Sequence, residues 1–127
     1  MIEVQQISGK GRGTIATQPI SEGTVIEIAP VGAFPAEQRA AIDQTAIFEY
    51  YFVRPPEYGQ GKYVPGYIVF GMSSLSNHTE HPNARVEWVE DEVGLWAHLV
   101  ALKDIARGEE VTVFYTNIDE YDTSEFV

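Results

Sequence analysis

Short apolar or β-branched runs recur along the chain, and Gly, Pro and charged turns separate them. This alternation of brief apolar runs with turn residues is typical of a domain built mostly from β-strands. The predicted strands cover Ile2–Ile7, Thr14–Thr17, Val25–Ala29, Tyr67–Phe70, Ala84–Val89, Leu95–Ala101 and Val111–Phe114. The pattern therefore predicts a mostly β fold.

One short helix is expected after the third predicted strand. Pro35 suits the first turn of a helix, and the residues from Ala36 to Thr45 include good helix formers and no glycine. The segment from Arg54 to Lys62 is expected to be a loop, because its paired prolines and two glycines suit neither a helix nor a central strand.

The chain contains one short internal repeat. Residues 16–28 match residues 101–113 at five positions without a gap, and each copy consists of a strand, a turn with a glycine and a second strand. The turn glycines, Gly23 and Gly108, permit the positive φ that such turns need. Because the pattern occurs only twice, it does not predict a solenoid.

Length and composition favour one domain over residues 1–127, large enough to bury a core without a disulfide or a metal. No stretch approaches the roughly 18 apolar residues of a membrane span, so no membrane association is expected. The N-terminus lacks the features of a secretory signal peptide, which predicts a cytoplasmic protein. The absence of cysteine excludes disulfides, a thiolate nucleophile and Cys-ligated zinc.

The charge balance is strongly acidic. Eight Lys and Arg stand against 19 Asp and Glu, which gives a formal net charge of −11 and makes direct binding of nucleic acid unfavourable. Much of the acid lies between Glu87 and Glu92 and between Asp119 and Glu125. A solvated surface is the simpler interpretation, and a docking surface for a basic polypeptide is the alternative.

A glycine-rich segment near the N-terminus is the first of three with chemical potential. Gly11-x-Gly13-x-x-Ala16 formally satisfies a dinucleotide-binding fingerprint, which must open a helix and be followed by an acidic ribose ligand. Pro19 cuts off any helix, and no acid occurs between Ala29 and Pro35. The segment therefore indicates a glycine-rich turn, whose backbone can pass close to a ligand.

The second segment, residues 71–84, is dense in small polar residues and includes Asn77, His78 and Asn83. Such a stretch suits a ligand loop, although these side chains could equally satisfy backbone groups in a long turn. The third segment runs from Gly108 to a strand-end tyrosine, Tyr115. Taken alone, a tyrosine in that position indicates core packing more often than catalysis.

In combination the three segments resemble the SET domain family. That family has a Gly-x-Gly turn, an Asn-His-Ser-x-x-Pro-Asn loop and a Gly-Glu-Glu-Leu-Thr-x-x-Tyr strand in this order. The counterparts here are Gly11-Arg12-Gly13, residues 77–83 and residues 108–115. Because it has no cysteine, the chain is most similar to the small stand-alone members of bacteria and viruses. The resemblance implies a SET-domain fold of short curved β-sheets, with one or two short helices and a knot-like threading of the C-terminus.

The resemblance also implies an activity, the S-adenosylmethionine-dependent methylation of lysine side chains in a protein substrate. Position by position, it implies that the Gly-x-Gly turn lines the methionine end of the cofactor. The next motif would hold the amino-acid and adenine portions, and the third motif would supply the catalytic tyrosine. An aromatic of the lysine channel is a further match. The implied cofactor-binding residues are Gly11, Arg12, Gly13, Asn77, His78 and Tyr115, and the implied catalytic residues are Tyr115 and Tyr50.

Three positions depart from the family pattern. Ser74 stands where many members have an arginine, Ser76 where an apolar residue is usual, and Phe114 where an aspartate often precedes the tyrosine. An inactive SET-like module that binds a protein is therefore the alternative function.

A β-barrel metal protein is a further alternative, because His78, His81 and His98 could offer three imidazoles. Pro82 directly after the first pair and the lack of a fixed spacing to His98 disfavour it, so no metal site is predicted. A Lys- and Arg-rich tail is the substrate that the acidic charge favours. The sequence leaves open the methylated protein, the number of methyl groups added and the oligomeric state, a homodimer included.

Overall fold

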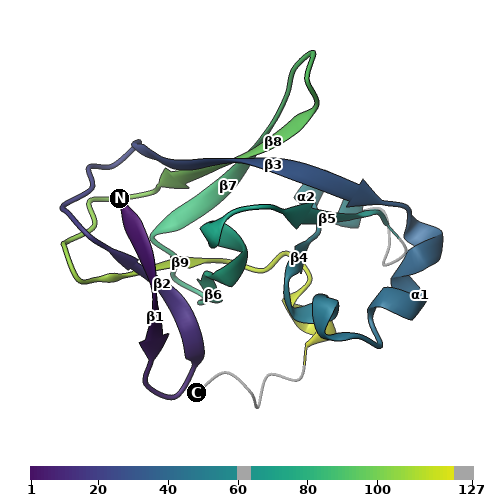
Figure 1. Cartoon of the computed structure of the whole chain (residues 1–127), viewed down its shortest axis with the longest axis horizontal. Coiled ribbons are helices and arrows are strands. Elements are labelled where there is room, and N and C mark those ends of the chain that lie inside the picture. Colours follow the sequence, from purple (N-terminus) through teal and green to yellow (C-terminus); the bar gives the residue numbers. More distant parts are fainter. Residues whose placement is uncertain (60–63, 122–127) are drawn as a thin grey trace.

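The computed structural model describes residues 1–59 and 64–121 (Figure 1). Its strands form two sheets. The order of the first sheet is β1-β2-β9-β6, and that of the second is β4-β5-β3-β8-β7. The strand bounds are β1 Ile2–Ile7, β2 Gly11–Ala16, β3 Val25–Phe34, β4 Tyr51–Phe52, β5 Gly66–Val69, β6 Asn77–His78, β7 Ala84–Glu90, β8 Leu95–Ala101 and β9 Glu110–Val113.

The helices are short and lie mostly at the end of the molecule opposite the β1–β2 hairpin (Figure 1). The α-helices are α1 Arg39–Ile42 and α2 Pro55–Tyr58, and the 3-10 turns are η1 Ala36–Gln38, η2 Ala46–Glu49, η3 Met72–Leu75 and η4 Ile118–Glu120. Within the described residues, none of these helices has the length and apolar character needed to cross a membrane.

The predicted mostly β fold is confirmed. β1 and β8 have the predicted bounds, and each of the other five predicted strands is present with shifted ends. The two-residue strands β4 and β6 were not predicted. Strand β6 lies in the segment expected to be a ligand loop, and its pairing with β9 joins residues far apart in the chain, which no local pattern encodes.

Strand β3 continues past the predicted end at Ala29 and includes Pro30. A proline is unexpected in a central strand because it cannot donate to the ladder. Up to Pro30 the strand pairs with β8, and from Val31 onward it pairs with β5. The missing N–H therefore falls where β3 changes partner, while the Pro30 carbonyl accepts a hydrogen bond of 2.9 Å from the Phe70 N–H.

The helix and loop predictions need correction. The helix expected from Ala36 to Thr45 is a 3-10 turn followed by one turn of α-helix that ends at Ile42. The segment expected to be a loop contains α2, because prolines at the first helical positions have no N–H to satisfy there. Residues 60–62 of that predicted loop lie outside the described residues.

The two copies of the internal repeat, residues 16–28 and 101–113, pair with each other around an approximate local two-fold axis. Ile20 and Ile105 each donate a backbone hydrogen bond of 2.8 Å to the carbonyl of the other. The N–H of each turn glycine, Gly23 and Gly108, donates over 2.8 Å to the carbonyl of the alanine that begins the other copy. Both glycines have positive φ, 83° and 87°, as expected.

Strand β9 lies between two segments from earlier in the chain. It pairs antiparallel with β2, where Thr14 faces Val111, and parallel with β6, where Asn77 faces Thr112. The C-terminal strand β9 therefore lies between β2 and β6 in the first sheet. The buried side chains of Leu99, Ile105 and Val111 belong to the core cluster beneath this arrangement.

Candidate active site

A pocket of about 800 Å³ opens beside β6 and the residues after β9, a volume in the range of small-molecule sites. Four segments contribute to it: the β1–β2 turn, the end of η2, the η3–β6 segment and the C-terminal segment. Its lining residues are Lys10, Gly11, Arg12, Glu49, Tyr50, Ser74, Leu75, Asn77, His78, Thr79, Glu80, Phe114, Tyr115, Ile118, Asp119 and Tyr121.

The structure brings six of the seven predicted site residues into this one pocket. They are Gly11, Arg12, Tyr50, Asn77, His78 and Tyr115, and Gly13 is not among the described lining residues. Lys10, Glu49, Asp119 and Tyr121 also line the pocket and were not predicted. Their only signal was proximity in sequence to predicted positions, because charged and aromatic residues of this kind occur throughout the chain.

The two glycines of the turn have different physical roles. Gly11 has a φ of 80°, a left-handed conformation that an L side chain rarely adopts. Gly13 is buried and has no positive φ, but a Cβ there would lie 2.7 Å from Asn77 Nδ2, 2.8 Å from Ile7 Cγ1 and 2.9 Å from Glu110 Oε2. Gly13 therefore leaves the space in which Asn77 and Glu110 meet.

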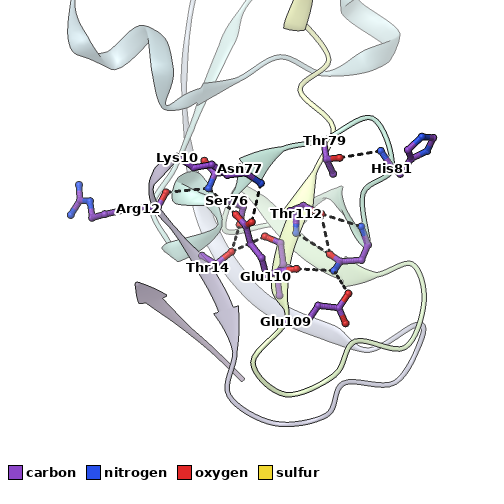
Figure 2. A network of polar contacts seen from close by, with 12 residues as sticks. Lys10, Arg12, Thr14, Ser76, Asn77, Thr79, His81, Glu109, Glu110 and Thr112 are labelled. Atoms are coloured by element: carbon purple, nitrogen blue, oxygen red, sulfur yellow. Dashed lines mark hydrogen bonds and ion pairs between the residues drawn. The ribbon is translucent and has the colours of Figure 1, made fainter. Parts of the chain in front are cut away.

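Asn77 is fixed by a polar network that joins β2, β6 and β9 (Figure 2). Its Nδ2 donates to Glu110 Oε2 over 2.8 Å and to the Arg12 carbonyl over 3.3 Å. The other oxygen of Glu110 forms an ion pair with Lys10 Nζ at 3.1 Å. The network therefore holds the amide of Asn77 and the ammonium of Lys10 at the same side of the pocket.

The segment that carries Asn77 and His78 is anchored at both ends. At its start, the Met72 and Ser73 N–H groups each donate over 2.9 Å to the carboxylate of Glu27 on β3. At its end, His78 pairs with Val113 on β9. The two sheets together therefore set the position of this wall of the pocket.

His78 and Tyr115 are joined directly. The Tyr115 backbone N–H donates over 2.9 Å to His78 Nδ1, so this nitrogen is unprotonated and the ring is neutral with its hydrogen on Nε2. Burial lowers the pKa of His78 below its usual 6.5, which also favours the neutral ring. The Tyr115 hydroxyl donates over 2.9 Å to the Ser76 carbonyl.

The phenol of Tyr115 is held in its neutral form. Burial, with smaller contributions from Glu110 and Glu49, raises its pKa to about 12. At neutral pH this hydroxyl therefore cannot act as a base, but it can donate one hydrogen bond and accept another.

Aromatic rings continue from Tyr115 along the pocket wall. The Tyr115 and Tyr121 ring centroids are 5.4 Å apart, and those of His78 and Phe114 are 4.8 Å apart. Tyr50, which is 37% exposed, lines the same pocket from η2. The wall therefore presents the rings of Tyr50, Tyr115 and Tyr121 to the pocket.

The sequence matches a family model described as SET domain over residues 11–116. The chain belongs to the SET domain family. A relative from Schizosaccharomyces pombe, named "Histone-lysine N-methyltransferase, H3 lysine-37 specific", is 33% identical over 115 residues, which cover 90% of this chain and 72% of the relative.

Two solved structures share the fold of this SET domain. One is a Plasmodium falciparum protein provisionally described as a histone methyltransferase, with a TM-score of 0.69 and 22% identity, covering 91% of this chain and 96% of that one. The other is the Neurospora SET domain protein DIM-5, a histone lysine methyltransferase, with a TM-score of 0.65 and 21% identity. The match covers 90% of this chain and 51% of DIM-5.

The SET domain accommodates its unusual Ser76 by a local compensation. The buried Ser76 hydroxyl lies 2.8 Å from Thr14 Oγ1, which also donates to the Val111 carbonyl over 3.0 Å. A polar side chain in the position of an apolar one is therefore satisfied by hydrogen bonds. Ser74 and Phe114 depart differently, because both line the pocket and Phe114 is 51% exposed.

Asn83 of the SET motif makes hydrogen bonds to the backbone of β9. It is buried, its Oδ1 accepts from the Thr112 N–H over 2.9 Å, and its Nδ2 donates to the Glu110 carbonyl over 2.8 Å. The side chain thus takes the place of a neighbouring strand for two backbone groups. For Asn83, the interpretation as a residue that satisfies the backbone is confirmed.

A buried guanidinium fixes the C-terminal wall of the SET domain. Arg39 is 3% exposed and donates to the Tyr51 hydroxyl over 2.8 Å and to the carboxylate of Glu120. The Tyr58 hydroxyl lies 2.8 Å from the carboxylates of both Asp119 and Glu120. These acids, assigned from sequence to a solvated or docking surface, therefore also attach η4 and the adjacent Tyr121 to α1 and α2.

The histidines of this SET domain do not form a cluster. Residues 1–59 and 64–121 contain no group of three or more His, Cys, Asp or Glu side chains suited to hold a metal ion. His78 lies in the first sheet, whereas His98 pairs with Ile28 and Glu87 in the second. Nothing in this geometry favours the metal-protein alternative.

Proposed function

We propose that this chain binds S-adenosylmethionine and transfers its methyl group to the side-chain amine of a lysine in a protein substrate. The observation that carries the proposal is the single pocket in which the Tyr115 hydroxyl, the Asn77 network and the Gly11 turn meet. Membership of the SET domain family supports the same activity. The alternative of an inactive binding module has no comparable support.

The residues present fit the cofactor chemically. Lys10 and Arg12 offer cationic groups for its carboxylate, and His78 with Phe114 offers ring surface for the base. When bound, S-adenosylmethionine would supply an electrophilic methyl group on a sulfonium: a neutral amine would attack the methyl carbon in line, an N–C bond would form as the S–C bond breaks, and S-adenosylhomocysteine would leave with the electron pair. The pocket residues would therefore hold the donor and leave Tyr115 and Tyr50 for the acceptor.

A lysine must lose its proton before it can act as the nucleophile, because its free pKa is about 10.4. A channel walled by tyrosine rings desolvates the ammonium, and a nearby positive charge repels it, so both lower its pKa. Tyr115 does not remove the proton, because its own pKa of about 12 keeps the phenol neutral. Its oxygen instead accepts a hydrogen bond from the amine and aims the lone pair, so positioning supplies much of the rate.

The substrate that best suits the site is a protein segment rich in Lys and Arg. Glu49, Glu80 and Asp119 line the pocket, and the net charge of −11 attracts a basic chain over distance. The relative named for histone H3 lysine-37 agrees with a protein substrate of this character. Asp122 and Glu125 of the acidic C-terminal segment lie outside the described residues.

The test is transfer of a labelled methyl group from S-adenosylmethionine to proteins of the source lysate and to a Lys- and Arg-rich peptide. Label on lysine, together with calorimetric binding of the cofactor, is the expected result. Cofactor binding without transfer to any lysine would leave the binding-module alternative. Absence of both would refute the proposal, and strong transfer that does not weaken as salt is added would refute the basic substrate.

A further inference from the structure

The outer face of the second sheet carries a row of apolar side chains. Pro30 on β3 lies opposite Trp96 on β8, which in turn lies opposite Val89 on β7. Directly opposite residues point to the same face of a sheet, so these three side chains form one row. Phe70 continues the row beyond β5, because its N–H donates to the Pro30 carbonyl over 2.9 Å. Its ring lies over Gly32, where an added Cβ would be 3.0 Å from Phe70 Cε2.

The side chains of this face are open to solvent. Phe70 is 63% exposed and Val89 is 37% exposed, and Ile28, in the next row of the same face, is 58% exposed. The opposite face of the same strands carries the buried Ala29 and Ala97 and is part of the core. Apolar residues exposed singly are ordinary on a protein surface, whereas a continuous row of them marks a site of interaction.

Acidic groups border the row on the β7–β8 hairpin, which extends away from the rest of the molecule (Figure 1). Between residues 84 and 101 the chain has one base, Arg85, and four acids, Glu87, Glu90, Asp91 and Glu92. Arg85 forms an ion pair with Glu87. The Asp91 carboxylate accepts a hydrogen bond of 3.0 Å from Trp96 Nε1, so a negative charge lies at the end of the apolar row. This position favours a docking surface over a merely solvated one.

Size and charge distinguish a second copy of this chain from a different partner. A second copy would bring a further net charge of −11 to a face that is already bordered by acids. A standard protein interface uses about 20–30 residues on each side, whereas three strand spacings of about 4.8 Å make this face only about 15 Å wide. An extended segment covers that width with about five residues. The face therefore suits a short basic segment better than a second copy.

We infer that this face docks a short segment of another protein, in which apolar side chains are interspersed with Lys and Arg. The apolar side chains pack on Phe70, Ile28 and Trp96. The cationic groups pair with the acids of the hairpin and stack on the Trp96 ring. No residue of this face is among the described residues that line the main pocket, so the inference goes beyond the proposed function and does not depend on it.

Binding of a short synthetic peptide of alternating Leu and Lys, measured by calorimetry without cofactor, tests the inference in the full chain. As a strand, this peptide presents its Leu side chains on one side. Phe70→Ser and Ile28→Ser should each lower its affinity about tenfold, whereas Ile47→Ser, at a 43% exposed residue of η2, should leave it unchanged. Glu92→Lys should weaken binding about threefold or more, and Glu37→Lys, in the exposed part of η1, is its matched control.

Wild-type affinity in both Phe70→Ser and Ile28→Ser would overturn the inference, as would equal affinity for a peptide of alternating Ser and Lys. If Phe70→Ser does not fold, Ile28→Ser alone makes the comparison. A dimer in sedimentation equilibrium that Ile28→Ser dissociates would assign the face to a second copy and overturn the inference. Amide NMR shifts locate the peptide independently of affinity. Changes at Ile28, Val89 and Trp96 support the inference, and changes confined to the residues of the main pocket contradict it.

Discussion

Gly13 separates two explanations of a glycine-rich turn, close approach to a ligand and close packing within the protein. A Cβ at this position would lie within 3.0 Å of atoms in Ile7, Asn77 and Glu110, which is closer than a real Cβ approaches. The Gly13→Ala variant must therefore move β1 or displace the Asn77 side chain from Glu110. Overpacking of this kind costs about 1–3 kcal/mol of unfolding free energy.

The displaced Asn77 gives Gly13→Ala a second expected effect. Because Asn77 lines the pocket and shares Glu110 with Lys10, the affinity for S-adenosylmethionine should fall together with stability. Urea unfolding measures the first effect, and titration calorimetry measures the second.

Gly59→Ala is the matched control for this variant. Gly59 has a φ of −63°, and its added Cβ would meet nothing closer than the Pro55 carbonyl oxygen at 3.7 Å. We expect it to be neutral or to stabilise by about 0.4–1 kcal/mol, through a smaller entropy of the unfolded chain. If Gly13→Ala matched the stability and cofactor affinity of the wild type, the packing role assigned to Gly13 would be wrong.

Three further predictions follow from the site. Asn83→Ala removes two hydrogen bonds to β9 and should lower the unfolding free energy, measured by urea unfolding, by about 2–5 kcal/mol. A loss below about 0.5 kcal/mol would contradict the role of Asn83 in stabilising β9. Tyr115→Phe should slow single-turnover transfer about 100-fold at saturating cofactor, and an unchanged rate would disprove the positioning role. Because burial lowers the pKa of His78 in the folded protein, the unfolded chain binds more protons than the folded chain as the pH falls below about 6.5. Stability should therefore decrease in that range, less steeply in His78→Gln, and equal slopes in urea titrations of both proteins would count against it.

Local patterns predicted those features in which a residue and its neighbours decide the conformation. Short apolar runs between turn residues predicted the observed bounds of β1 and β8, and the positive φ of Gly23 and Gly108 followed from the turn chemistry. The sequence predicts a loop where α2 forms, because paired prolines and two nearby glycines suit neither a helix nor a central strand. The same residues begin a helix when their missing N–H groups fall in its first turn.

The sequence by itself determined the β-rich class, the order of the three motifs and, through their resemblance to a family, six of the sixteen residues that line the pocket. Only the tertiary structure placed Gly13 under Asn77, let Asn83 act as a strand for β9, and brought the buried Arg39 to the C-terminal wall. The physical reason is the large sequence separation between the residues in contact. A local pattern encodes φ, ψ and the face of a strand, whereas these contacts join residues 27 to 81 positions apart and depend on how the two sheets pack.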